Sequence, residues 1–260
     1  MNEFQALLLG ILQGLTEFLP VSSSGHLEIG HHLLGVTGHN NLLFAVVVHV
    51  ATVLSTIVVF RKDIAELLKG LFAFKWNEPT IYVSKLVISA IPVLILGLFF
   101  KDQIEELFTG NLVLVGSALV FTSLLLGATH FAKSGDGKIT FSKAIIIGIA
   151  QAIAVIPGIS RSGSTIATGL LLKNKKEDVA RFSFLMVLIP ILGAAFLDIM
   201  SGEVTSGDNI GVVPLLVGFI AAFVSGLLAC SWMIKIVKRG KLIYFAIYCL
   251  IIGVIAIFAA

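Results

Sequence analysis

The chain has 260 residues, of which 57% are hydrophobic and 13% charged, and its formal net charge is +3. A soluble domain of this length could not bury so much apolar surface, so the composition predicts an integral membrane protein with several spans. Lys and Arg cluster beside apolar segments, which indicates membrane orientation and argues against nucleic-acid binding.

The first element is a broken apolar segment at about 5–35. Residues 10–13 read Gly-Ile-Leu-Gln, and 20–26 read Pro-Val-Ser-Ser-Ser-Gly-His. Proline interrupts a helix, and Ser is a favoured residue at a helix N-cap. We therefore expect two half-helices joined at the proline. The N-terminal residues lack the charged start and cleavage site of a signal peptide, so we expect them to be retained.

Six apolar runs approach the length of a membrane-spanning helix. They are 42–60, 81–100, 112–132, 183–200, 211–234 and 242–259. The basic loops 61–85, 133–143, 173–181 and 235–241 are predicted to be cytoplasmic, and the acidic loops 101–111 and 198–210 external. Cys230 and Cys249 lie in apolar stretches and imply no disulfide framework.

The segment 144–172 repeats the first element. Residues 148–151 read Gly-Ile-Ala-Gln and 157–164 read Pro-Gly-Ile-Ser-Arg-Ser-Gly-Ser, and several positions match the first segment at an offset of 138. The basic loops on both sides place its two ends on the same face of the membrane. We interpret it as a re-entrant hairpin. The alternative is one long helix or two complete helices.

The predicted fold is an all-α polytopic membrane protein with an inverted-topology repeat. Each half is a re-entrant helical hairpin plus three transmembrane helices. The chain, 1–260, is one integral membrane domain with halves at about 1–132 and 143–260. Because three spans separate the hairpins, the second hairpin enters from the opposite face. Two helix N-termini would meet inside the bilayer, where their free N–H groups and dipoles suit an anion.

Charged and reactive side chains lie at these tips. Arg161 deep in the bilayer costs about 2.5–3.5 kcal/mol, and its planar donors suit phosphate. Glu17 is a base, a metal ligand or a counter-ion that merely holds the hairpins together, and Gln13 shares its helix face. His26 is an acid–base or nucleophilic group, or a satisfied core residue.

The chemistry that these groups support is phosphoryl transfer. Arg161 and the helix ends would hold the phosphate charge. Either Ser23 or His26 would attack phosphorus, or they would position water. Glu17 would act as base or would bind a divalent metal that bridges the phosphates.

Both motifs resemble the signatures of the bacterial undecaprenyl-pyrophosphate phosphatases, the bacitracin-resistance proteins. The first signature is 13–26, the second is 157–165, and the similarity extends to the ending Phe-Ala-Ile-Tyr at 245–248. The resemblance implies hydrolysis of undecaprenyl pyrophosphate to undecaprenyl phosphate and inorganic phosphate. This reaction recycles the lipid carrier for peptidoglycan and other wall polymers.

The resemblance implies a set of site residues. The catalytic residues are Glu17, Ser23, His26 and Arg161. The neighbouring tip residues are the predicted substrate-binding set: Gln13, Ser22, Ser24, Gly25, Ser160, Ser162, Gly163 and Thr165. The family has Glu or Gln at position 13, and the Gln form leaves the acid–base or metal role to Glu17. A divalent cation, Mg²⁺ or Ca²⁺, is implied, with Glu17 as its ligand.

The predicted partner is a polyprenyl pyrophosphate lipid, and bacitracin would act indirectly by competing for that lipid. A homodimer and a monomer stay open. The expected location is the bacterial inner (plasma) membrane, with the site toward the external face. The alternative function is a transporter or flippase for a phosphorylated polyprenyl lipid, because inverted repeats with broken helices recur in transporters. The roles of Glu28 and His49 also stay open.

Overall fold

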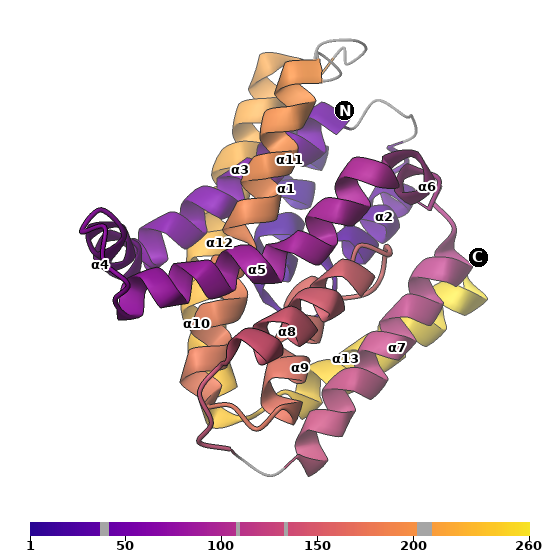
Figure 1. Ribbon diagram of the computed structural model, residues 1–260. Helices are drawn as coiled ribbons and strands as arrows, with labels where there is room; N and C mark the ends of the chain where they lie inside the picture. The colour runs from indigo at the N-terminus through magenta and orange to yellow at the C-terminus, as the bar shows by residue number, and fades with distance from the viewer. Residues whose placement is uncertain (37–41, 108–109, 133–134, 202–209) are drawn as a thin grey trace.

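The computed structural model describes residues 1–36, 42–107, 110–132, 135–201 and 210–260. Within these ranges every regular element is a helix (Figure 1). The first half comprises α1 (Glu3–Phe18), α2 (Ser23–Leu33), α3 (Leu42–Val59), α4 (Arg61–Leu71), α5 (Glu78–Phe99), α6 (Lys101–Glu105) and α7 (Leu112–Phe131). The second half comprises α8 (Phe141–Ile153), α9 (Arg161–Leu171), α10 (Lys176–Met186), α11 (Leu188–Ser201), α12 (Val212–Arg239) and α13 (Ile243–Phe258).

The long helices confirm three of the six predicted spans, 81–100, 112–132 and 211–234. In the described part of the chain, α5, α7 and α12 are long and apolar enough to cross a membrane. Helix α3 passes the same test only together with α4, from which it is bent by 79°. Helix α13 is a shorter apolar helix at the last predicted span. The chain is therefore an all-helical protein suited to a bilayer.

Several predicted stretches differ from the structure. The predicted loops 101–111, 173–181 and 235–241 are partly helical, because α6, α10 and α12 extend into them. The span 183–200 was predicted as one helix, but it is divided at Val187 between α10 and α11. Pro190 explains the break, because it has no N–H for the Met186 carbonyl and its ring crowds that carbonyl. The predicted loop 61–85 contains the amphipathic helix α4. A hydropathy profile does not detect α4, because its charged residues lower its mean hydropathy. The loop charges at 133–134 and 202–209 lie outside the described residues.

The two broken segments form helix pairs, as predicted. Helices α8 and α9 have 13 and 11 residues, and the break between them contains Pro157 and Gly158. A helix needs about 20 residues to cross a bilayer, so neither is a complete span, and together they are not one continuous helix. The opposite entry of the two pairs into the bilayer stays a prediction.

Matched glycines pack each helix pair against a long helix from the other half. A Cβ added at Gly10 of α1 would collide with the Gly218 carbonyl of α12. A Cβ at Gly148 of α8, the matched position, would collide with the Ser89 carbonyl of α5. Small residues allow such close approach of helices in membranes. Each helix pair therefore packs against a helix of the other half, and the two halves form one packed unit (Figure 1).

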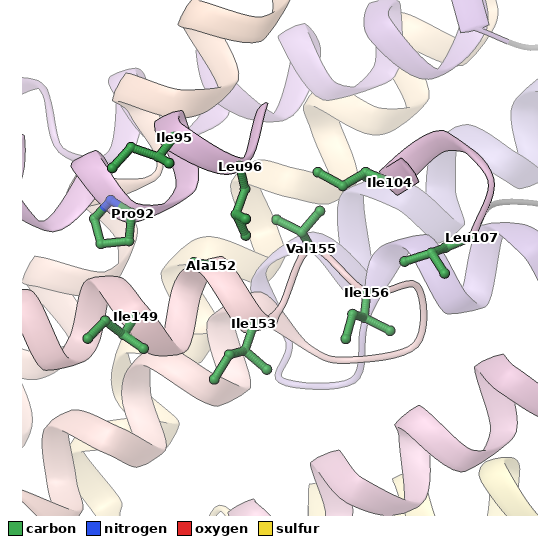
Figure 2. A pocket seen from close by; sticks show the side chains of 10 residues that line it. All are labelled: Pro92, Ile95, Leu96, Ile104, Leu107, Ile149, Ala152, Ile153, Val155 and Ile156. Atoms are coloured by element: carbon green, nitrogen blue, oxygen red, sulfur yellow. The ribbon is translucent and has the colours of Figure 1, made fainter. Parts of the chain in front are cut away.

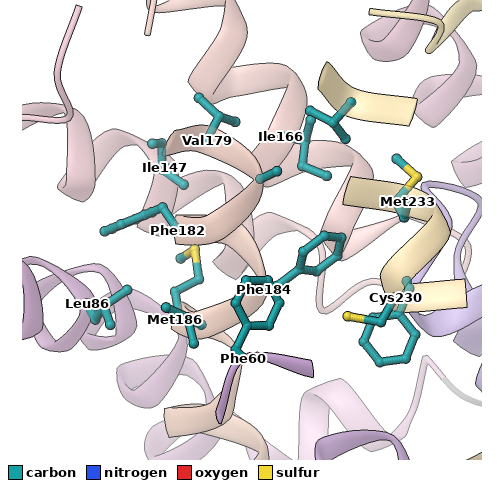
Figure 3. Close-up of a cluster of buried hydrophobic side chains, with 14 of the residues drawn as sticks. Phe60, Leu86, Ile147, Ile166, Val179, Phe182, Phe184, Met186, Cys230 and Met233 are labelled. Atoms are coloured by element: carbon teal, nitrogen blue, oxygen red, sulfur yellow. The ribbon is translucent and has the colours of Figure 1, made fainter. Parts of the chain in front are cut away.

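The largest buried apolar cluster lies beside the helix pairs. Figure 3 shows Phe182, Phe184 and Met186 of α10 packed among side chains from α8, α9 and α12. The Phe184 ring meets the Phe18 ring edge-on, with centroids 5.9 Å apart. Because Phe18 ends α1, this cluster fixes the end of the first helix and the residue before it, Glu17.

Candidate active site

Both helix pairs turn at tips that end in a capped helix N-terminus. Ser22 caps α2, and its Oγ accepts a hydrogen bond of 3.2 Å from the Gly25 N–H. Ser160 caps α9, and its Oγ accepts a hydrogen bond of 3.0 Å from the Gly163 N–H. These positions share the 138-residue offset, so the sequence repeat produces the same cap twice.

The two tips touch each other. The Ser162 hydroxyl of the second tip donates to the Leu19 carbonyl of the first at 3.0 Å. A Cβ added at Gly25 would lie 3.0 Å from the Cα of Gly158. Gly158 has a φ of +95°, and a Cβ there would also collide with the Val115 carbonyl. Glycine is thus required where the tips meet.

Glu17 is the centre of a polar network between the tips. Its Oε2 accepts hydrogen bonds from Gln13 Nε2 at 2.9 Å and Ser23 Oγ at 2.7 Å. Its Oε1 pairs with the Arg161 guanidinium across the tip contact. The Glu17 side chain is buried, and removing one partner of a buried ion pair costs about 3–5 kcal/mol. The pair therefore joins the tips and sets Ser23 beside a carboxylate.

His49 adds a fourth group to this network. Its Nε2 lies 3.8 Å from Glu17 Oε2, while its Nδ1 lies 2.8 Å from the Ala45 carbonyl. Its position on α3 places its ring beside the polar network. The sequence had left the role of His49 open. Glu28 is half-buried on α2 and makes none of these contacts.

His26 points to a different part of the protein. Its Nδ1 lies 2.8 Å from the Ser22 carbonyl, and its Nε2 lies 2.8 Å from the Tyr248 hydroxyl on α13. The two rings stack with centroids 5.6 Å apart. Both ring nitrogens are therefore engaged. Tyr248 entered the sequence analysis only through the resemblance of the chain's ending, and nothing there linked it to His26.

Hydroxyls on the second tip and on neighbouring helices hold its backbone. The Ser160 N–H donates to Thr122 Oγ1 at 3.0 Å, and that hydroxyl donates to the Gly158 carbonyl at 3.3 Å. Thr165 Oγ1 lies 3.0 Å from the Arg161 carbonyl and 2.6 Å from Ser183 Oγ. Thr122 and Ser183 are supporting residues that sequence reasoning missed, because they lie on other helices.

The remaining tip hydroxyls form two matched pairs. Ser22 and Ser24 have their Oγ atoms 3.3 Å apart, and Ser160 and Ser162 have theirs 3.4 Å apart. Each pair occupies the same positions of its repeat. These hydroxyls cap and cross-link the tips, and they line the two helix ends that the sequence predicts to bind an anion.

A metal ion would find oxygen ligands beside Glu17 rather than a complete protein cage. In the described ranges there is no cluster of three or more His, Cys, Asp or Glu residues that could hold a metal. Gln13 Oε1 is buried without a partner, because the amide nitrogen must face a carboxylate that only accepts. One carboxylate and one amide oxygen fit Mg²⁺ or Ca²⁺, whose other ligands would be water and substrate phosphate.

Two cavities differ sharply in chemistry. A small one lies at the polar network and the break between α10 and α11. Its lining is Glu17, Phe18, Thr52, Val53, Thr56, Arg161, Phe184, Val187 and Ile191. A larger one of about 440 Å³ is lined only by apolar side chains of α5, α6, α8 and the second tip, including Pro92 and Val155 (Figure 2). Of these two cavities, only the small one is lined by charged side chains, Glu17 and Arg161.

Comparison with known proteins gives consistent similarities. The family model described as "Bacitracin resistance protein BacA" matches residues 6–255. A protein of Bacteroides fragilis named "Undecaprenyl-diphosphatase" is 57% identical, covering 99% of this chain and 98% of its own length. Proteins of the same name from Christiangramia forsetii and Carboxydothermus hydrogenoformans are 53% and 40% identical, covering 100% and 98% of this chain and 99% and 96% of their own lengths.

Proposed function

The chain belongs to the BacA bacitracin-resistance family, and we propose that it hydrolyses undecaprenyl pyrophosphate to undecaprenyl phosphate and inorganic phosphate. The observation that carries this proposal is the buried network in which the Glu17 carboxylate accepts from Ser23 and pairs with Arg161. A base, a hydroxyl and a guanidinium in contact can supply the proton acceptor, the nucleophile and the positive charge for phosphoryl transfer.

Ser23 is the nucleophile in this proposal. Its hydroxyl already donates to Glu17 at 2.7 Å, whereas both nitrogens of His26 are engaged elsewhere. Ser23 Oγ bonds to the terminal phosphorus as its proton moves to Glu17, and the bond to the bridging oxygen breaks. Glu17 passes that proton to the departing lipid phosphate. Water then attacks the phosphoserine, giving its proton through Glu17 to the leaving Ser23 oxygen.

Arg161 and the helix ends would hold the phosphate oxygens. A guanidinium has five N–H donors in a fixed plane, so Arg161 can keep a bond to Glu17 and still donate to phosphate. The N-termini of α2 and α9 add free N–H groups and the positive ends of two helix dipoles. Donors held in place before the reaction stabilise charge that develops in the transition state.

The divalent cation is also part of the proposal. Glu17 and the free Gln13 Oε1 would hold Mg²⁺ or Ca²⁺ together with the substrate. When bound, the cation supplies neutralisation of the pyrophosphate charge. Gln13 itself keeps Glu17 oriented through its amide nitrogen, so it contributes to the site with and without the cation.

The membrane arrangement completes the proposal. The two helix pairs enter the bacterial plasma membrane from opposite faces and meet at a site open to the external face. The loop charges and the short α1, α2, α8 and α9 support this arrangement. Bacitracin would then compete with the protein for the same pyrophosphate lipid. The homodimer stays a prediction.

Phosphate release by purified protein in detergent tests the proposed function. We expect release from undecaprenyl pyrophosphate that depends on Mg²⁺ or Ca²⁺ and stops with chelator. Ser23→Ala should reduce kcat/KM by about 10³-fold or more, because it removes the nucleophile. The matched control is Ser231→Ala, an exposed serine of α12 that bonds only its own helix. Full activity of Ser23→Ala would exclude the serine mechanism.

A further inference from the structure

Helix α13 holds the first tip through two neighbouring side chains. The Tyr248 hydroxyl lies 2.8 Å from His26 Nε2, and the Cys249 thiol lies 3.6 Å from the Pro20 carbonyl. Tyr248 is separated from His26 by 222 positions, so the contact is entirely tertiary. The first tip is thus anchored from outside its own helix pair, through His26 and Pro20.

The hydrogen bond to the Ser22 carbonyl fixes the tautomer of His26. A backbone carbonyl only accepts hydrogen bonds, so Nδ1 must carry the proton that is donated to Ser22. In a neutral imidazole, Nε2 then carries a lone pair and needs a donor. The Tyr248 hydroxyl is placed to be that donor. Tyr248 therefore stabilises the one neutral tautomer that can hold the Ser22 carbonyl.

The Ser22 carbonyl controls the residue that follows it. Ser22 has a φ of +68°, a left-handed value that is unfavourable for a residue with a side chain. Its carbonyl accepts from His26 twice, through Nδ1 at 2.8 Å and the backbone N–H at 3.1 Å. A peptide group is planar, so fixing this oxygen also fixes the N–H of Ser23 and the start of α2.

We propose that Tyr248 is a positioning residue that acts through His26 to keep Ser23 in register with Glu17. This role rests on the proposed function, because it assigns Ser23 to the reaction. Among the described residues, the hydrogen bond and the ring stacking of Tyr248 are both with His26, so its effect passes through the Ser22–Ser23 peptide. A tyrosine that only packed on the His26 ring would work equally well as phenylalanine.

The test compares Tyr248→Phe with Tyr244→Phe in the full-length protein. Both variants lose one hydroxyl and keep the ring, and Tyr244 lies one turn earlier on α13, 64% exposed. One hydrogen bond contributes about 1 kcal/mol, so Tyr248→Phe should lower kcat about 5- to 10-fold with KM within about twofold. Tyr244→Phe should leave both constants within about twofold. Wild-type kcat in Tyr248→Phe would overturn the proposal.

Two further measurements separate positioning from a general loss of structure. In a His26→Ala background, Tyr248→Phe should change kcat by less than about twofold, because residues that act as a unit are non-additive. Equal losses in both backgrounds would contradict the role. Nitrogen NMR of ¹⁵N-histidine protein should show the His26 Nε2 signal shifting in Tyr248→Phe only, with His26→Ala giving the assignment.

The NMR measurement also distinguishes failure of the positioning role from failure of the proposed function. An unchanged His26 signal in Tyr248→Phe overturns the positioning role whatever the activity. A wild-type protein that releases no phosphate from undecaprenyl pyrophosphate overturns the proposed function instead, and with it the link to Ser23.

Discussion

The two hairpin tips share a backbone plan and differ in the side chains that it carries. Ser22 and Ser160 cap matched helices in the same way. Yet the residue that matches Glu17 of the first tip, 138 positions later in the second tip, is Val155. Glu17 lines the small polar cavity, whereas Val155 lines the large apolar one (Figure 2). The sequence repeat gives two equivalent helix ends, and single-residue differences give these ends different side chains.

A second matched position makes the same point. Ser23 begins α2, and Arg161 begins α9 at the equivalent place. Both side chains reach Glu17, one from each tip. In the proposed mechanism, the hydroxyl and the guanidinium in these equivalent positions would give the site one reactive side and one charge-holding side. The tip comparison therefore predicts that equal substitutions will have unequal effects.

The largest effect among single conservative changes should come from Arg161→Lys. Lysine keeps the charge that balances Glu17 but loses the planar fork that can bind carboxylate and phosphate together. We expect kcat/KM to fall about 100-fold with the protein still folded. The control is Arg181→Lys on α10, whose Nε lies 2.7 Å from Asp63 outside the site. Equal losses in both variants would contradict a phosphate-holding role for the second tip.

The tip contact itself is tested by Gly25→Ala. The added Cβ would lie 3.0 Å from Gly158 and 3.2 Å from the Val115 side chain, so the tips must separate slightly. Overpacking costs about 1–3 kcal/mol, and we expect activity to fall about tenfold. Gly127→Ala on α7 meets no atom within 4 Å and should be harmless. An unaffected Gly25→Ala protein would show that the tips need not touch. Phosphate release and thermal unfolding in detergent are measured for both variants.

The smallest effect should come from a buried polar contact that joins two long helices and includes no tip residue. Ser55 of α3 donates to the Phe223 carbonyl of α12 at 2.8 Å. Hydrogen bonds between membrane helices contribute about 0.6 kcal/mol on average, so Ser55→Ala should lower the free energy of unfolding by about that amount. Activity should stay within about twofold. A loss comparable to that of Gly25→Ala would mean that any buried contact matters as much as the tips.

The fold could be predicted where hydropathy and proline determine it. The runs 112–132 and 242–259 became α7 and α13 with ends shifted by at most one residue. Proline alone was not sufficient, however. Pro92 lies inside α5 without ending it, whereas Pro190 follows a break by three residues. Whether a proline divides a helix depends on how neighbouring helices satisfy the freed carbonyl, which a single sequence does not encode.

The site could be predicted where one motif holds all the groups. Glu17 and Ser23 lie six residues apart, and their hydrogen bond follows from the tip that joins their helices. The Arg161 contact needed the repeat, which places the second tip opposite the first. Tyr248 and Thr122 could not be identified, because their roles depend on helix packing over long sequence distances. The catalytic roles themselves stay predictions.

In the proposed function, the Glu17–Arg161 pair between the tips is the active site and not merely a structural bridge. Replacing both residues, as Glu17→Gln with Arg161→Gln, removes the chemistry without leaving a buried unpaired charge. We expect this double variant to unfold within a few degrees of wild type and to release phosphate from undecaprenyl pyrophosphate at least about 10³-fold more slowly. Release within about tenfold of wild type would contradict the account.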